Sequence, residues 1–571
     1  MKNIKLYVLP FLILLISVTA CKDDFLDQDP KQSLSSNELS SLAGLEGSLI
    51  ASYSMLLGRD GFYSDASNWL WGSIRGGEAN KGTDPGDQSV ANPVVAYGVP
   101  TNNGPTLSKY RACYEGIARA NATLGLLAVA QESVPADAKT RIEAEAKFLR
   151  GYYYFDLKKN YNNTPYVDEN WDEVTPITNT ADLYVSIEAD LKHAYENLPE
   201  MMADAGRANK WAAGALYAKA LLFQGKSSEA LAVFNKVIAD GVTANGTPYG
   251  LLDNYADAFR SLTDNSKESV FASQAAANTG TIQNANPALV LNFPNGGGPG
   301  GCCGFFQPSF DMVNSFRTDV NGFPLVDGSY NNADNAVASD MGIEAADPFT
   351  PDAGNLDPRI DHSVGRRGLP YLDWGNHPGK TWIRNQPYAG PYAPKKFIYY
   401  QGGVGVENDG SSWTPGYTAV NYNIIRFADV LLMAAEAEIE SNGDLDRAKD
   451  LINIVRQRAM DSPVQDASGS DAANYVIGLY ASFGSQDEAR QAVRFERRME
   501  LSGEGHRMYD LNRWGISATT LNPYLAHEDA FLSGGPYQGA SFDANQDEFL
   551  PIPQDEIDLL GADVLTQNPG Y

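Results

Sequence analysis

The feature that most restricts the fold of this chain is a set of alanine-rich segments in which apolar residues recur every three or four positions. That spacing places the apolar side chains along one side of a helix. The stretch NKWAAGALYAKALLFQGKSSEALAVFNKVIADG, which starts at Asn209, holds two such segments separated at Gly225. Ala230 and Phe234 reproduce the Ala-x3-Phe spacing of a tetratricopeptide second helix. We therefore expect antiparallel helix pairs that stack through small residues.

The same periodicity predicts two groups of helices with a long aperiodic region between them. The segments 58–105 and 241–421 are rich in Gly, Pro, Asn, Asp, Trp and Tyr. Loops of this length are functional or disordered, and their aromatic residues favour order. The predicted fold class is mainly α, with a tetratricopeptide-like helical-pair scaffold and a long loop-rich, aromatic-rich ligand-binding half. The expected helices cover residues 109–130, 137–161, 181–198, 209–225, 226–240, 422–440, 445–460 and 488–501.

The N-terminus predicts export from the cytoplasm. Lys2 and Lys5 precede an apolar run at residues 6–16, as in a secretory signal. The sequence Val18-Thr19-Ala20-Cys21 resembles a bacterial lipobox, in which the cysteine is acylated, so we expect lipidation at Cys21. The alternative is a plain secretory cleavage that leaves Cys21 as an ordinary thiol. A lipidated chain would be anchored to a membrane without spanning it.

Three regions follow from these signals. We expect a lipoprotein signal peptide at 1–20 and an N-terminal region at 21–240 that combines helix pairs with the loop carrying Trp69. A C-terminal region at 241–571 is expected to be loop-rich through 421 and helical from 422. After Cys21, no stretch reaches the roughly 18 apolar residues that a membrane-spanning helix needs.

Charge and motifs argue against most enzyme classes. The formal net charge of -28 repels phosphate backbones, which disfavours nucleic acid and favours a neutral or cationic ligand. The glycines at 296–301 satisfy GxGxxG, but no helix is expected after them to hold a phosphate. His527-Glu528 begins an HExxH pattern that Phe531 breaks, and GxSxG is absent. We expect no metal site and no cofactor, while a pair of distant glycosidase carboxylates stays open.

Two adjacent cysteines lie in NGGGPGGCCGFFQPS at residues 295–309. Cys302 and Cys303 cannot form a CxxC redox motif, and the few remaining cysteines cannot complete a metal cluster. In an oxidising compartment the choice is between a vicinal disulfide and two thiols packed as small apolar groups. We favour the disulfide, which would stiffen the loop and present a flat face next to Phe305 and Phe306.

Four separated segments carry a more specific signal. They are CKDDFLD at 21–27, YNIIRFADVLLMAAEA at 422–437, RRMEL with GHR and DLNRWG at 497–515, and LPIPQDEI with QNPGY at 550–571. In this order they are similar to the mature start and the signature sequences of the SusD/RagB family of Bacteroidetes outer-membrane lipoproteins. The resemblance spans the whole chain.

This resemblance implies a function. A member of the family would be a nutrient-uptake lipoprotein of the outer membrane, without catalysis, that serves as glycan-binding lid or partner of a SusC-type TonB-dependent transporter. Lys22-Asp23-Asp24 resembles the signal that sends such lipoproteins to the extracellular side of the outer membrane. We therefore expect a cell-surface protein that captures oligosaccharide or polysaccharide and delivers it to the transporter. The alternatives are a surface glycoside hydrolase and a transporter lid that binds peptide.

Sugar binding calls for flat aromatic surfaces with polar groups at their rim, carried on loops. Trp69 and Trp71 have the spacing of the sugar-stacking tryptophans that the resemblance implies for this N-terminal loop, although two core tryptophans are the alternative. Residues 80–84 would add hydrogen bonds. The predicted groove lies between the Trp69, Cys302 and Trp374–Trp382 loops. Its expected lining is Trp69, Trp71, Arg75, Asn80, Cys302, Cys303, Phe305, Phe306, Tyr371, Trp374, Trp382 and Tyr388, with Tyr392 as a further candidate.

Charged residues inside the apolar helical runs have a structural interpretation instead. Buried charges must pair, so we expect these residues to tie the C-terminal segment onto the helix pairs. They are Arg426, Asp429, Arg498, Glu500, Arg507 and Asp510.

Overall fold

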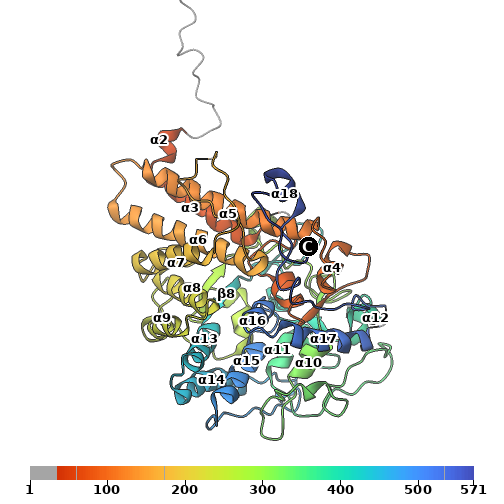
Figure 1. Cartoon of the computed structure of the whole chain (residues 1–571). Coiled ribbons are helices and arrows are strands. Elements are labelled where there is room, and N and C mark those ends of the chain that lie inside the picture. The colour runs from red at the N-terminus through yellow and green to blue at the C-terminus, as the bar shows by residue number, and fades with distance from the viewer. Residues whose placement is uncertain (1–34, 60, 173, 533) are drawn as a thin grey trace, which may run out of the picture.

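The computed structural model describes residues 35–571 except 60, 173 and 533, and its N-terminal part is a stack of antiparallel helices (Figure 1). Each helix of the stack packs against the next. The predicted helices of this region are present, although the first begins at Gly104, where the Asn103 side chain caps it by accepting from the Thr106 N–H. The stack comprises α3 (Leu42–Tyr53), α5 (Gly104–Ala128), α6 (Ala136–Tyr161), α7 (Tyr184–Asn197), α8 (Lys210–Phe223) and α9 (Ser227–Asp240).

Three later helices extend this stack. α13 (Phe427–Glu440) packs against α9 as well as against α14 (Leu445–Met460) and α15 (Gln486–Glu500). Because it lies between these neighbours, every α13 residue except the last is buried. The fold is thus largely helical and tetratricopeptide-like, as predicted. The predicted signal peptide and Cys21 lie outside the described residues.

The prediction of a helix over 422–440 is wrong at its start. Tyr422–Arg426 forms the strand β8, which pairs antiparallel with β2 (Ser269–Ser273). Ile424 and Ile425 have the branched side chains that strands favour. Their pairing partner lies far away in the sequence, so periodicity within this segment does not reveal it.

Apart from the 15-residue helix α17, the remaining elements are short. Three further two-stranded antiparallel sheets join β1 (Ala79–Gly82) to β3 (Phe305–Pro308), β4 (Val364–Gly365) to β5 (Ala393–Pro394) and β6 (Asn408–Asp409) to β7 (Tyr417–Thr418). The other helices are α2 (Ser36–Leu39), α4 (Asn92–Val95), α10 (Phe310–Ser315), α11 (Arg359–Ser363), α12 (Gln386–Ala389), α16 (Arg507–Arg513), α17 (Ser517–Phe531) and α18 (Gln554–Leu560).

The aromatic loops contain a small hydrophobic core of their own. Phe293, Tyr371, Trp382 and Tyr399 form its centre, and Trp374 packs against it. The Tyr371 and Trp382 rings meet edge to face with centroids 5.4 Å apart. The loops thus bury most of these aromatic residues against one another, without a long helix or strand to cover them.

Buried ion pairs connect the C-terminal helices to the rest of the protein, as predicted. Asp429 lies 2.8 Å from Lys219 on α8 and 2.7 Å from Arg497 on α15. Arg426 contacts Glu268, Glu500 and Glu504, Arg498 contacts Asp311, and Asp510 contacts Arg497 and Arg513. Arg507 differs: within the described residues no carboxylate lies within 4 Å of it, and burial lowers its pKa to about 10.

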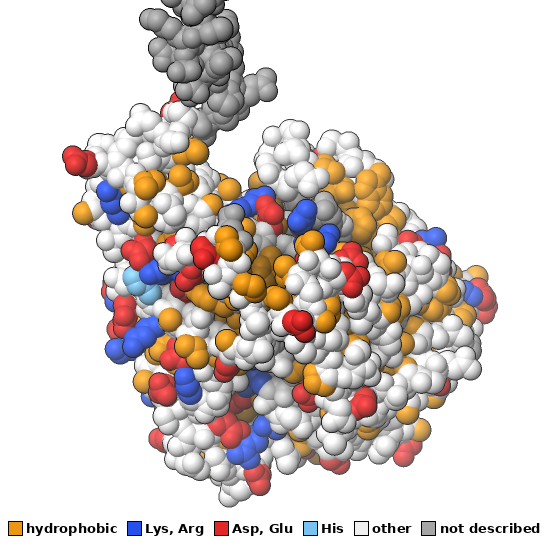
Figure 2. Space-filling view, turned by 45° about the horizontal axis from the view of Figure 1, so that its top comes forward, with side chains coloured by type: hydrophobic (Ala, Val, Ile, Leu, Met, Phe, Trp, Pro, Cys, Tyr) orange, Lys and Arg blue, Asp and Glu red, His pale blue; other side chains and the backbone are white. Residues whose placement is uncertain are grey.

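The surface mixes charges of both signs. Figure 2 shows acidic and basic side chains interspersed on the face turned forward, with hydrophobic side chains gathered in a hollow near its middle. Within the described part of the chain, no helix combines the length and the apolar composition that crossing a membrane requires.

Candidate functional site

The two tryptophans predicted to stack on sugar lie in the protein core. Trp69–Ile74 forms a single π-helical turn, and Trp69 and Trp71 are only 2% and 0% exposed. The Trp69 indole N–H donates to the Phe62 carbonyl at 2.8 Å, and that of Trp71 donates to the Tyr63 carbonyl at 2.6 Å. The prediction that Trp69 and Trp71 line the groove is therefore wrong. Both rings are covered by other parts of the chain, and both indole N–H groups are hydrogen-bonded inside the protein.

The backbone of this turn is also packed tightly against a distant segment. The turn is pressed against the segment before α16: a Cβ on Gly72 would stand 1.9 Å from the Gly505 carbonyl oxygen. The Gly505 N–H accordingly donates to the Ser73 hydroxyl at 2.8 Å. Arg75 is also buried and donates to the Asp547 carbonyl, so it too is removed from the surface.

The structure nevertheless brings together the three loops that were predicted to meet. β1 pairs with β3, which places Gly82 opposite Phe305, and the Thr83 N–H donates to the Gly304 carbonyl. On the other side of the glycine-rich loop, the Asn295 N–H donates to the Trp382 carbonyl at 2.8 Å. We call the surface formed by residues 83–87, 295–304 and 384 the loop junction.

Most predicted side chains build the interior of this junction. Asn80 is buried and bridges two segments, since its amide donates to the Ala389 carbonyl while its oxygen accepts from the Gly82 N–H. Buried with it are Cys303, Phe305, Tyr371, Trp382, Tyr388 and Tyr392, whereas Cys302, Phe306 and Trp374 are partly exposed. The aromatic residues that were predicted to line the groove therefore mainly pack beneath the loops and support them, and few of their rings are exposed.

Arg384 is the most prominent polar group of the loop junction. Its Nη1 donates to the Asp87 carboxylate at 2.6 Å and to the Thr83 hydroxyl at 3.0 Å, and its Nη2 lies 2.8 Å from the Asp84 carboxylate. The Arg384 side chain is 41% exposed. Guanidinium and carboxylate groups in such a fixed arrangement can bind sugar hydroxyls through donors and acceptors together. Sequence reasoning passed over Arg384 and Asp87, although Arg384 lies two residues after Trp382.

Lys81 fixes the turn at residues 84–87, which carries Asp84 and Asp87, from the buried side of the junction. It is buried, and its ammonium group donates to the Asp84 carbonyl at 2.8 Å and to the Asp87 carbonyl at 2.5 Å. The same group lies 5.5 Å from the centre of the Tyr388 ring and 5.8 Å from that of Phe305. Burial lowers the pKa of Lys81 to about 8. Lys81 and the two predicted aromatic residues therefore fix the position of the turn.

The adjacent cysteines are joined. A disulfide links Cys302 to Cys303, with Cys303 buried and Cys302 partly exposed.

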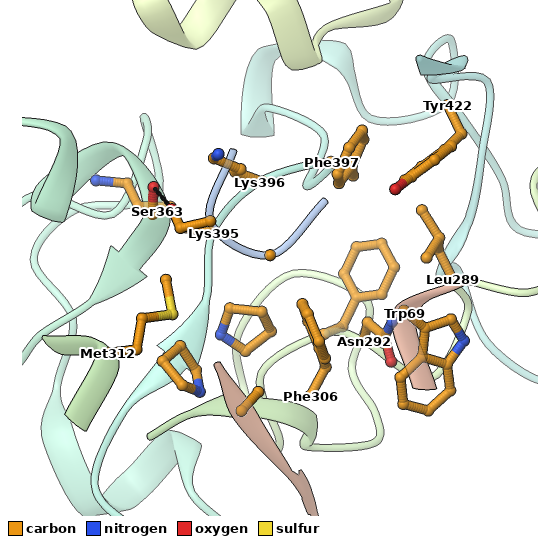
Figure 3. A pocket seen from close by; sticks show the side chains of 16 residues that line it. Trp69, Leu289, Asn292, Phe306, Met312, Ser363, Lys395, Lys396, Phe397 and Tyr422 are labelled. Carbon is orange, nitrogen blue, oxygen red and sulfur yellow. Dashed lines mark hydrogen bonds between the residues drawn. The ribbon is translucent and has the colours of Figure 1, made fainter. Parts of the chain in front are cut away.

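Phe306 packs toward the core, and the centres of the Phe306 and Trp69 rings are 5.9 Å apart. Both rings line a cavity of about 30 Å3 together with Phe397 and Tyr422 (Figure 3). A cavity of this size has room for a few water molecules but not for a sugar ring.

An exposed tryptophan that sequence reasoning missed stands beside the same loop. Trp413 is 56% exposed, and its indole N–H donates to the Tyr417 hydroxyl at 3.0 Å. The next residue, Thr414, donates from its hydroxyl to the Gly300 carbonyl at 2.6 Å, which fixes the tryptophan next to the glycine-rich loop. The segment NDGSSWTPG around Trp413 is rich in turn-forming residues, and this composition was the available signal.

The described residues offer little for metal chemistry. Among them, no group of three or more His, Cys, Asp or Glu side chains is arranged to hold a metal ion. What the loop junction and Trp413 do provide is an exposed aromatic side chain and a set of exposed hydrogen-bonding groups, both held next to the glycine-rich loop. This combination suits the alternating C–H and hydroxyl surfaces of a carbohydrate.

Comparison with known proteins gives consistent results. Residues 267–571 match the SusD family, and residues 24–222 match a family described as starch-binding associating with outer membrane. A SusD-like protein of Formosa agariphila is 26% identical over 533 residues, which is 89% of this chain and 90% of that protein.

Solved structures share the fold. A SusD superfamily protein from Bacteroides vulgatus superposes with a TM-score of 0.69 at 20% identity, covering 93% of this chain and 99% of the other. Surface glycan-binding protein A from Bacteroides thetaiotaomicron, solved in complex with laminarihexaose, gives a TM-score of 0.66 at 21% identity and covers 92% and 99%.

Proposed function

Because this chain belongs to the SusD family, we propose that it is a cell-surface lipoprotein that captures an oligosaccharide at the loop junction and delivers it to a SusC-type TonB-dependent transporter. In this proposal Cys21 carries the lipid anchor, and the loops face the extracellular medium. The protein binds its ligand and does not cleave it. One protein of the same fold was solved with laminarihexaose, so the fold can carry an oligosaccharide.

The observation that carries the proposal is that the exposed ring of Trp413 and the polar group of Arg384 both lie next to the glycine-rich loop, one near Gly300 and the other near Gly304. Arg384 is held by Asp84 and Asp87 before any ligand arrives, so binding costs little side-chain entropy. Trp413 is similarly fixed by its hydrogen bond to Tyr417. A sugar ring stacked on Trp413 would remain in contact with solvent on one side, as expected for a protein that must release its ligand to a partner.

Calorimetric titration of the purified chain with laminarihexaose and with the strongest ligand from a glycan array tests the site. We expect Trp413→Ala and Arg384→Ala each to weaken binding by about 1 kcal/mol, which is roughly fivefold. Trp171→Ala is the matched control, because Trp171 is also exposed, at 40%, but lies in the loop after α6. Equal affinities for the wild type, Trp413→Ala and Arg384→Ala would refute the proposed site.

Two further measurements address the other parts of the proposal. Incubating the protein with its glycan and measuring newly formed reducing ends tests the absence of catalysis, and release of reducing ends would favour the hydrolase alternative. Purifying the full-length protein from membranes of its own host tests the partnership. We expect a TonB-dependent transporter to accompany the wild-type chain, and a chain that purifies alone would contradict delivery to such a transporter.

A further inference from the structure

A second pocket, separate from the loop junction, has an unusual lining for so acidic a protein. It has a volume of about 280 Å3 and lies between the segments that follow α9, β4, β5 and α14. The chain carries a formal charge of -28, yet no Asp or Glu side chain lines this pocket. Its lining residues are Asn254, Ala256, Phe259, His362, Pro370, Leu372, Lys395, Lys396, Ile398, Tyr400, Pro463, Val464 and Gln465.

The two lysines of the pocket differ in how their charges are compensated. The Lys396 ammonium group lies 2.6 Å from the Glu504 carboxylate, so an internal ion pair neutralises it. Lys395 donates to two backbone carbonyl oxygens, those of Asp361 and Pro370, and within the described residues it has no carboxylate within 4 Å. The Asp361 carboxylate itself accepts from Arg366 and Tyr475.

Lys395 is therefore a buried cation paired with neutral oxygens. It is 4% exposed, and burial lowers its pKa to about 8. An ammonium group has three N–H donors; the two carbonyls accept from two of them, and the centre of the Tyr371 ring lies 5.9 Å from the ammonium nitrogen. The Asp361 carboxylate acts on this charge only from beyond 4 Å and is itself paired with Arg366. A buried charge without a directly bonded counter-ion is unfavourable, and an anionic group that entered the pocket would reduce that cost.

The other lining groups suit the rest of a sugar. His362 stays neutral at physiological pH, since burial lowers its pKa to about 4, so it neither attracts nor repels an anion. Asn254 and Gln465 supply amides, and Tyr400 supplies a ring that the Arg260 guanidinium covers at 3.9 Å from the ring centre. A pocket of this volume has room for one sugar ring.

We propose that this pocket binds a sugar residue through an acidic substituent, a carboxylate or a sulfate ester, with Lys395 as its counter-ion. The inference goes beyond the proposed function, because it adds a site of different ligand chemistry away from the loop junction. Such a site would let the protein distinguish charged from neutral glycans, since charge-assisted hydrogen bonds are stronger than neutral ones.

Titration of the purified chain with glucuronic acid, glucose 6-sulfate and glucose tests this proposal. We expect one of the acidic sugars, or both, to bind at least about tenfold more tightly than glucose. Comparison of the two acids identifies the preferred group. Lys395→Met should remove the preference, with its circular dichroism spectrum and melting curve checked against the wild type.

A variant at the exposed rim keeps the test independent of core packing. Gln465 is exposed, so Gln465→Glu should fold normally and weaken acidic-sugar binding about threefold or more, while Gln465→Lys should strengthen it. The matched control is Gln283→Glu, which adds the same charge at an exposed position outside the pocket.

Three outcomes would overturn the inference. They are equal binding of glucose and the acidic sugars, equal effects of the Gln465→Glu and Gln283→Glu substitutions, and loss of acidic-sugar binding in Arg384→Ala. The last outcome would place the acidic sugar at the loop junction. Retained binding in that variant supports the separate pocket, whether or not laminarihexaose binds, so the two proposals can fail independently.

Discussion

Replacing Glu500 by glutamine removes the charge at the centre of the buried ion network while keeping the shape of the side chain. Glu500 is completely buried at the end of α15. One of its oxygens lies 3.0 Å from Arg426 and also contacts Arg458, and the other lies 3.1 Å from Arg359. Burial alone would raise the pKa of this carboxyl group, but the three guanidinium groups lower it to about 2.

The size of the effect follows from this pKa. The pKa of Glu500 lies about 2.5 below the ordinary value of 4.5. Folding therefore favours the ionised form by on the order of 3 kcal/mol. Because the pKa is lowered by folding, this stabilisation is fully present above about pH 4.5 and is lost as the pH falls through about 2. We expect Glu500→Gln to destabilise the protein by about 3 kcal/mol at pH 7 and by about 1 kcal/mol at pH 3.

Urea-induced unfolding followed by tryptophan fluorescence at pH 7 and pH 3 measures both values. Other carboxyl groups titrate over the same range, so the informative quantity is the difference between the wild type and the variant at each pH. Glu132→Gln is the control, since Glu132 is exposed and should change stability by no more than about 0.5 kcal/mol. A loss below about 1 kcal/mol at pH 7, or an equal loss at both pH values, would refute the assignment of Glu500 as a stabilising anion.

Three further predictions concern the loops. Trp71→Ala should destabilise the protein by about 3–5 kcal/mol in urea unfolding, because it leaves a cavity in the core; a stable variant with weakened glycan binding would instead restore Trp71 to the binding surface. Mass spectrometry of the unreduced protein should show a peptide lighter by two hydrogens with Cys302 joined to Cys303, and a free-thiol mass would contradict the disulfide. Lys81→Met should weaken glycan binding severalfold in calorimetric titration, because the turn at residues 84–87 loses its support; unchanged affinity would show that this turn does not contact the ligand.

Local periodicity was sufficient to predict the helical scaffold. α14 begins and ends at the predicted residues, and α6 begins one residue early. Each of these helices buries one face against the next helix, so apolar residues recur every three or four positions along its sequence. β8 was missed because its pairing with β2 depends on a segment that is distant in the chain.

The binding surface was predictable only in part. The sequence indicated three loops that should meet, and β1, β3 and the Asn295–Trp382 hydrogen bond bring them together. It did not distinguish the aromatic residues that support these loops from those that remain exposed. Trp71 and Trp413 both lie in loops rich in glycine and serine or asparagine, yet the first is fully buried and the second is 56% exposed.

By itself, the sequence determined the helix pairs, the similarity to the SusD/RagB family and the loops that carry the candidate site. The tertiary structure alone decided which side chains of those loops reach solvent. A helix is specified by residues a few positions apart, whereas the turn that carries Trp71 packs against a segment more than four hundred residues away, where Gly505 contacts Gly72. Burial of a loop residue is a property of what covers it, and that neighbour cannot be read from the residue's own surroundings in the chain.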